Sequence, residues 1–348
     1  MPILDQLSAQ LDRLAAFEPG PFPVLSLYLN LQPDQNGRDH YEPFLKKELA
    51  ERLRTFPASG PERESFETDA EKIRTYLEGV DRAANGLAMF ACSGADLFDA
   101  IPVAAPIRDN RLYVSPQPHL YPLACLIDEY PRYAVLLTDT NSARIFVFAG
   151  NSVQRTEQVD GVKTRRHKMG GWSQARYQRH TENFHLQHAK EVADALARVV
   201  RDEAIGAIVI AGDDVIVPLL KEQLPKELTD KLIDVVKLDI RAPEREVLDA
   251  TIAALRNQDA EADRNTVDAL IGAYRANGLA VVGIEATRKA LEMGQVDELV
   301  IAAPPPDERV GDELVAKARQ TAAKIRIVQD PSVLAGVGGV GALLRFKA

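Results

Sequence analysis

The sequence predicts a mixed α/β protein of three domains. Its 348 residues exceed what one hydrophobic core usually serves. Short apolar runs alternate with longer amphipathic segments along the whole chain, as strands and helices do in α/β folds. Hydrophobic residues make up 46% and charged residues 27%, which is typical of globular proteins. We expect the domains at residues 1–130, 131–262 and 263–348.

The first domain opens with an amphipathic helix in MPILDQLSAQLDRLAAFEPG, whose acidic residues distinguish it from a signal peptide. Leucines alternate with other residues in FPVLSLYLNL, which predicts a strand over 22–31. Helices are expected within 40–56 and 64–81, and strands within 85–94 and 97–106. The proline-punctuated stretch SPQPHLYPL leads to the end of this α/β domain, near Pro131.

The second domain begins with a predicted hairpin over 132–153, in which two β-rich runs flank DTNSA. A helix is expected from about Thr181, a suitable N-cap, because apolar-face positions then recur every three or four residues. These positions are Phe184, His188, Val192, Leu196 and Val199. The runs that follow predict a strand over 204–212 and a short helix over 214–225. A second strand over 232–240 and long helical material over 243–278 come next. A sheet with crossover helices is therefore expected.

The third domain repeats the order of helix and short apolar strand between residues 279 and 330 and closes with PSVLAGVGGVGALLRF. This alternation predicts a small αβα sandwich. The glycines of the closing stretch resemble a phosphate loop but lack the lysine of a Walker motif, so close backbone packing is the preferred interpretation.

Two cysteines, Cys92 and Cys125, lie in apolar contexts without a CxxC pair, which predicts buried reduced thiols. The longest apolar runs are far below the roughly 20 residues of a membrane span. We expect a cytoplasmic protein without membrane contact.

A basic segment stands out in a chain whose formal net charge is −9: residues 161–181 hold six Lys or Arg and no Asp or Glu. Such a segment predicts an exposed loop that faces a polyanion, and RNA is the natural candidate. Gly170 and Gly171 permit close backbone approach, and Trp172 could stack on a base. The candidate RNA-binding residues are Lys163, Arg165, Arg166, Lys168, Arg176, Tyr177 and Arg179. The alternative is a solvated loop whose two glycines form a turn.

The stretch RRHKMGGWSQARYQRH resembles the glycine-glycine-glutamine loop of archaeal and eukaryotic class-I release factors. The matching residues are Gly170, Gly171, Ser173, Arg176, Tyr177 and Arg179. Trp172 occupies the glutamine position. NGLAMFACSG and RKALEMGQVDELVI are similar to stretches of the same factors, and LAGVGGVGALLRF resembles the ending that they share with Pelota. The chain is identified as a bacterial member of this release factor and Pelota superfamily.

The resemblance implies a ribonuclease H-like middle domain, which carries its loop into the ribosomal peptidyl transferase centre, and an L7Ae-like C-terminal domain. It implies binding to the ribosomal A site, contact with rRNA and the tRNA acceptor end, docking of a translational GTPase or RNA, a monomeric state and no cofactor. The loop would orient a water that hydrolyses peptidyl-tRNA, with Gly170, Gly171, Trp172 and Gln174 as catalytic candidates. Gln174 would replace the missing glutamine from two residues downstream.

Three functions remain open from the sequence. The stop-codon motifs N-I-K-S and Y-x-C-x-x-x-F are missing from residues 1–130, which favours codon-independent peptidyl-tRNA hydrolysis in ribosome rescue. The second hypothesis is a non-catalytic hibernation or occupancy factor similar to Balon. The third is an RNA-binding or nuclease-like enzyme that acts away from ribosomes.

Two further clusters are weaker candidates. His180, His185 and His188 follow the basic segment, but no P-C-x-x-C or spaced carboxylate completes a zinc site, so no metal is expected. Asp213 and Asp214 end a predicted strand, where many α/β folds place catalytic groups. We expect them to cap the following helix instead.

Overall fold

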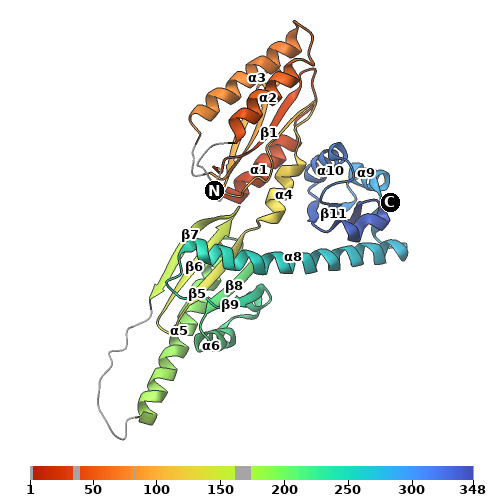
Figure 1. Cartoon of the computed structure of the whole chain (residues 1–348). Helices are drawn as coiled ribbons and strands as arrows, with labels where there is room; N and C mark the ends of the chain where they lie inside the picture. Colours follow the sequence, from red (N-terminus) through yellow and green to blue (C-terminus); the bar gives the residue numbers. More distant parts are fainter. Residues whose placement is uncertain (1–2, 34–39, 81–83, 161–173, 348) are drawn as a thin grey trace. The chain divides into compact units, whose positions relative to one another are not determined.

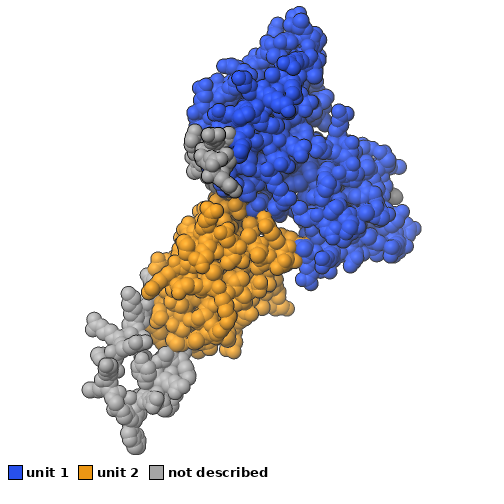
Figure 2. All heavy atoms as spheres, viewed as in Figure 1, with its two compact units in different colours: residues 1, 3–130, 260–348 blue, residues 2, 131–259 orange. Residues whose placement is uncertain are grey.

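The computed structural model describes residues 3–33, 40–80, 84–160 and 174–347, and only the backbone of 3–6, 160 and 174–182. The chain divides into two compact units (Figure 2): unit 1 combines residues 3–130 with 260–348, and unit 2 spans 131–259. Three β-sheets with helices lie in these units, which confirms the mixed α/β class.

The first sheet of unit 1 is antiparallel, in the order β3-β2-β1-β4. Its strands are β1 (Val24–Asn30), β2 (Gly86–Cys92), β3 (Leu97–Val103) and β4 (Arg111–Ser115), with the 3₁₀ turn η1 (Ser93–Ala95) between β2 and β3. The helices of this region are α1 (Ile3–Ala15), α2 (Tyr41–Leu53), α3 (Pro61–Glu78) and α4 (Tyr121–Glu129). The expected helices and strands are confirmed, whereas β4 and α4 were not expected. Pro122 stands at the second position of α4, where a missing N–H costs the helix nothing.

Both faces of β1 are buried, for different reasons. Leu25, Leu27 and Leu29 pack into a core with side chains of α2 and α3. Ser26 and Tyr28 alternate with these leucines and face the turn before α4. The Ser26 Oγ accepts a hydrogen bond of 2.9 Å from the backbone N–H of His119, and the Tyr28 hydroxyl donates one of 2.6 Å to its carbonyl.

The second sheet of unit 1 has the order β10-β13-β11-β12 and belongs to the C-terminal region. Its strands are β10 (Ala280–Val282), β11 (Val296–Ala302), β12 (Lys324–Val328) and β13 (Val340–Leu344), and only the pair β11 and β12 is parallel. The helices are α9 (Ile284–Glu292), α10 (Glu308–Gln320), the 3₁₀ helix η2 (Pro331–Val337) and the second half of α8 (Glu244–Arg275). Leu270 of α8 packs in a core with Val300 of β11.

Glycines near the end of the chain serve close packing, as expected. Gly338 and Gly339 have φ angles of 79° and 74°, in the region that favours glycine. A Cβ on Gly341 would lie 2.7 Å from Leu270 Cδ2 and 3.0 Å from the Val281 carbonyl. The packing interpretation is therefore confirmed.

Unit 2 contains a five-stranded sheet in the order β7-β6-β5-β8-β9 (Figure 1). Its strands are β5 (Tyr133–Thr138), β6 (Ser142–Ala149), β7 (Ser152–Asp160), β8 (Ala207–Gly212) and β9 (Leu232–Val236). The hairpin of β5 and β6 is antiparallel, and β8 and β9 continue the sheet parallel to β5. Helix α5 (Gln174–Asp202) precedes β8, and α6 (Ile216–Gln223) and α7 (Lys226–Thr229) precede β9. The predicted crossover sheet is confirmed.

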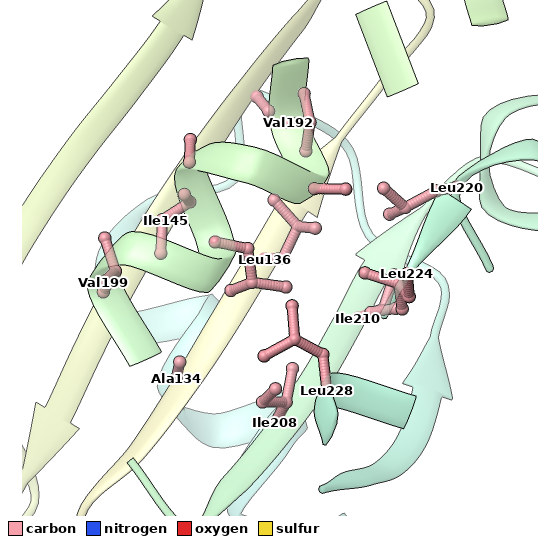
Figure 3. Packing of buried hydrophobic residues seen from close by; sticks show 14 of the residues in the cluster. Ala134, Leu136, Ile145, Val192, Val199, Ile208, Ile210, Leu220, Leu224 and Leu228 are labelled. Atoms are coloured by element: carbon pink, nitrogen blue, oxygen red, sulfur yellow. The ribbon is translucent and has the colours of Figure 1, made fainter. Parts of the chain in front are cut away.

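Helix α5 covers one face of this sheet. Val192 and Val199 lie against Leu136 and Ile145 of the central strands (Figure 3). The alternate residues of β5, including Val135, face a second core that contains Val247 from the first half of α8. The central strands are therefore buried on both sides, which explains their nearly continuous apolar sequence.

The start of α5 corrects one expectation. The helix begins at Gln174, seven residues before Thr181, so the prediction of Thr181 as N-cap is wrong. Glutamine, alanine and arginine in QARYQRH favour helix, and neither glycine nor proline follows Gly171 before Gly206. Once nucleated, a helix adds one hydrogen bond for each further residue, so a run of good helix formers can extend it toward its N-terminus.

The two cysteines are free, and we predict that both react slowly in the native protein. Cys92 is fully buried and Cys125 is partly buried. Burial raises the pKa of the Cys92 thiol and raises that of Cys125 to about 12, so the reactive thiolate is scarce at pH 8. Iodoacetamide labelling followed by mass spectrometry should show slow labelling in buffer and fast labelling in urea. Equal rates in both conditions would contradict the buried positions.

Candidate nucleic-acid interface

The glycine segment is flanked by two regular elements of unit 2. Strand β7 ends at Asp160 and α5 begins at Gln174. The following predicted site residues lie outside the described residues: Lys163, Arg165, Arg166, Lys168, Gly170, Gly171 and Trp172. Their roles remain predictions.

The remaining predicted site residues lie in the first two turns of α5, where the structure describes the backbone alone. They are Gln174, Arg176, Tyr177 and Arg179. The first N–H groups of a helix have no intrahelical partner and carry the positive end of the helix dipole. The backbone at Gln174 therefore adds to the preference of the neighbouring basic sequence for an anion.

The C-terminal end of α5 is fixed by ion pairs. Glu203 pairs with Arg132 and, at 3.1 Å, with Arg155. Glu157 of β7 pairs with Arg155 at 2.8 Å and with Arg198 of α5 at 3.4 Å. The hydrogen bond to Glu203 raises the pKa of the Arg155 guanidinium, which stays charged. Each of these three arginines is paired with one of the two carboxylates, so they attract an anion less than unpaired cations would.

Carboxylates also lie at the carboxyl ends of the parallel strands β5 and β8, where α/β sheets commonly place ligand sites. Asp139 accepts hydrogen bonds from the backbone N–H groups two and three residues further on, at 2.7 and 2.8 Å. Asp213 does the same at the start of α6, with 2.9 Å for each bond. Asp214 pairs with Lys237 at 2.8 Å. Asp213 thus bonds to the backbone at the start of α6, as the capping expectation implied, whereas Asp214 pairs with Lys237 instead.

The strands β5 and β8 approach each other closely at this edge. A Cβ on Gly212 would lie 2.5 Å from the Thr138 carbonyl oxygen, so only glycine fits without a backbone shift. No group of three or more His, Cys, Asp or Glu among the described residues is arranged to hold a metal ion.

His188 lies on the buried face of α5, as the periodicity predicted. Its side chain is 1% exposed, and neither ring nitrogen has a hydrogen-bond partner within the described part of the chain. His185 is half-buried one turn earlier, and the side chain of His180 is outside the described residues.

Comparisons with known proteins agree with this arrangement. The model of "Bacterial archaeo-eukaryotic release factor family 10" matches residues 118–256, the region that holds the whole of unit 2 except its last residues. Peptide chain release factor subunit 1 of Aeropyrum pernix is 24% identical over 241 residues, which cover 64% of this chain and 63% of the relative. Residues 118–256 therefore match a bacterial release factor family, and the chain is similar to archaeal peptide chain release factors over about two thirds of its length.

Two further relatives show how far the likeness reaches. Eukaryotic peptide chain release factor subunit 1 of Stylonychia lemnae is 23% identical over 56% of this chain and 46% of its own length. An uncharacterized protein of Mycobacterium tuberculosis is 26% identical over 68% and 71% of the two chains. The matches thus span about half to two thirds of the length of the first release factors.

Solved structures of this superfamily align with most of the chain. The archaeal translation termination factor aRF1 is 18% identical, with 99% of this chain and 98% of that chain covered and a TM-score of 0.29. Dom34 of S. cerevisiae is 13% identical, with 77% and 82% covered and a TM-score of 0.46. Within the described ranges, no helix is both long and apolar enough to cross a membrane.

Proposed function

We propose that this release factor-like protein binds the ribosomal A site and presents residues 165–179 to rRNA or to the acceptor end of tRNA. The observation that carries the proposal is the family match over 118–256. This range holds the sheet of unit 2, helix α5 and the basic glycine segment between them. Residues 263–348 would dock a translational GTPase or RNA.

The charge distribution supports an RNA target. Six Lys or Arg within 161–181 stand in a chain of net charge −9, so the rest of the protein repels phosphate while this segment attracts it. The N-terminus of α5 adds backbone N–H groups at the same place. An interface of this kind releases counterions, so its affinity for RNA falls steeply as salt rises.

Codon-independent hydrolysis of peptidyl-tRNA is the proposed activity. The reaction needs an oriented water and a donor for the oxyanion that forms on the ester carbonyl. A backbone N–H beside Gly170 and Gly171 would supply the donor, and Gln174 would orient the water. No acid–base triad is required for this chemistry.

Occupancy without hydrolysis is the second candidate function, and two observations favour it. Trp172 replaces the glutamine of the family loop. Gln174 is the first residue of α5, so its backbone follows a helix that is held in the core of unit 2. This role would protect or block the A site of an idle ribosome.

A peptide-release assay separates the two candidates. Ribosomes with labelled peptidyl-tRNA are incubated with the wild type, Gln174→Ala and Gly171→Ala, and with Gln187→Ala as an exposed control on the same helix. If the protein is a hydrolase, we expect both site variants to lose about 100-fold in rate, the size typical for a lost transition-state contact, and the control to lose nothing.

The outcomes are distinct. Co-sedimentation with ribosomes without release would assign the occupancy function. Release that survives both site substitutions would show that the active segment is elsewhere. If the protein neither co-sediments with ribosomes nor releases peptide at low salt, the ribosome proposal itself is refuted.

A further inference from the structure

Unit 1 contains a cavity of about 280 Å³, whereas the basic segment proposed to contact the ribosome belongs to unit 2. It lies beside Ala303 and Gln329, which follow the parallel strands β11 and β12. Strand β4 and helix α4 supply its other walls. The carboxyl ends of parallel strands are the usual ligand position in α/β sheets. The volume is near the lower limit for ligand pockets, so it suits one ring system with a substituent.

The walls of the cavity are flat and largely apolar. The rings of Tyr113 and His119 stack with their centroids 3.5 Å apart and their planes inclined by 31°. The ring of Tyr28 lies edge-on to each of them, with 6.4 Å between the ring centroids. Pro304 and Pro305 contribute further flat surface. Walls of this kind favour a planar ring.

His119 is held in one orientation by groups from both halves of unit 1. Its Nδ1 contacts Asp312 of α10, whose other carboxylate oxygen accepts a 2.9 Å hydrogen bond from the Tyr121 N–H. Its backbone N–H and carbonyl bond to Ser26 and Tyr28. Burial raises the pKa of the Tyr28 phenol, so this hydroxyl stays protonated and donates. With Nδ1 engaged, Nε2 is the ring nitrogen left for a ligand.

The charged side chains that line the cavity disfavour a ligand with a phosphate group. The lining includes the carboxylates of Asp109, Glu129 and Glu308 and the guanidinium groups of Arg108 and Arg111. Arg108 pairs with Glu129 at 3.2 Å, and Arg111 lies 3.7 Å from Asp109. The two cations are therefore balanced, and the carboxylate of Glu308 is in excess. It would accept hydrogen bonds from an amino group and repel an anion.

We infer that this cavity binds the base of a nucleoside without phosphate. The ring would lie against the aromatic wall, while His119, Glu308 and Gln329 bond to its polar edge. A nucleobase carries several donors and acceptors on one flat ring, which matches these three groups. A phenyl or indole ring would leave most of them unpaired at a cost in free energy. A free nucleoside presents such a base without a phosphate, whereas phosphates flank the bases of RNA.

Binding is tested with the full chain by calorimetry and ligand-observed NMR. The probes are adenosine, AMP, ribose, N-acetyl-tryptophanamide and a six-residue oligoadenylate. We expect adenosine to bind, AMP to bind at least about tenfold more weakly, and ribose and N-acetyl-tryptophanamide not to bind. Oligoadenylate should not compete with adenosine, because each of its bases is flanked by phosphate, and strong competition would contradict the charge argument.

Two substitutions locate the site. Leu126→Trp places a larger side chain in the cavity lining and should abolish adenosine binding, whereas Leu279→Trp, at an exposed position of unit 1, should not change it. If Leu126→Trp does not fold, Tyr113→Ala removes the half-exposed aromatic wall and should weaken adenosine at least about tenfold, a typical value for a lost stacking contact.

A third substitution tests the charge argument. Glu308→Gln removes the excess carboxylate and should bring the affinity for AMP closer to that for adenosine. The inference is overturned if adenosine does not bind, if N-acetyl-tryptophanamide binds more tightly, or if adenosine binding survives the cavity variants. None of these measurements involves ribosomes, so their failure leaves the proposed function unaffected.

Discussion

Replacing Arg165, Arg166 and Lys168 together by glutamate is expected to weaken ribosome binding by at least about two orders of magnitude at near-physiological salt. The change removes three of the six cations in 161–181 and adds three anions, so the formal charge of the segment falls from +6 to zero. Each phosphate contact that is lost also removes about one unit from the slope of log affinity against log salt. The variant should therefore bind weakly and with a shallow salt dependence.

Co-sedimentation with ribosomes over a salt series measures both effects. The matched control reverses Lys221, Lys226 and Arg245, three exposed cations on other helices of unit 2, and changes the net charge of the protein by the same amount. If the basic segment forms the interface, the control should bind almost like the wild type. Equal losses in both variants would mean that overall charge governs the association, and unchanged binding in the first would exclude the segment from the interface.

Leu196→Ala is expected to destabilise unit 2 by about 3 kcal/mol, within the usual range for a buried leucine. Leu196 is fully buried in the core between α5 and the sheet, so truncation leaves a cavity under the helix that carries the site. The backbone of α5 cannot collapse into this space without displacing the neighbouring valines. The loss in free energy of unfolding should therefore be close to that found where the surroundings of a truncated side chain do not relax into the cavity.

Urea unfolding measures the free energy of unfolding, and hydrogen exchange locates the effect. Protection should fall in 131–259 and remain in 3–130, because the two regions belong to different compact units. Val215→Ala, at an exposed position of unit 2, is the control and should cost less than about 0.5 kcal/mol. Equal loss of protection in both units would show that they unfold as one.

Elements with a clear period were predictable from the sequence. The alternating leucines of β1 are buried as expected, and so are four of the five predicted core-facing positions of α5, 188, 192, 196 and 199, whereas Phe184 is partly buried. Strand β4 and helix α4 were not expected, because they are short and lie among prolines that usually indicate loops. The start of α5 was misplaced because residues 174–180 carry no apolar period in the sequence and favour helix by propensity alone.

The sequence by itself determined the basic segment, its two glycines and the resemblance to release factors, because charge and motif are properties of neighbours along the chain. Only the tertiary structure decided what surrounds His119. Its partners Tyr28 and Asp312 are 91 and 193 residues away, and no local period relates them. Ser26 and Tyr28 alternate with the leucines of β1 and carry hydroxyl groups, yet both are buried. A sheet face is exposed or covered according to what the rest of the chain packs on it.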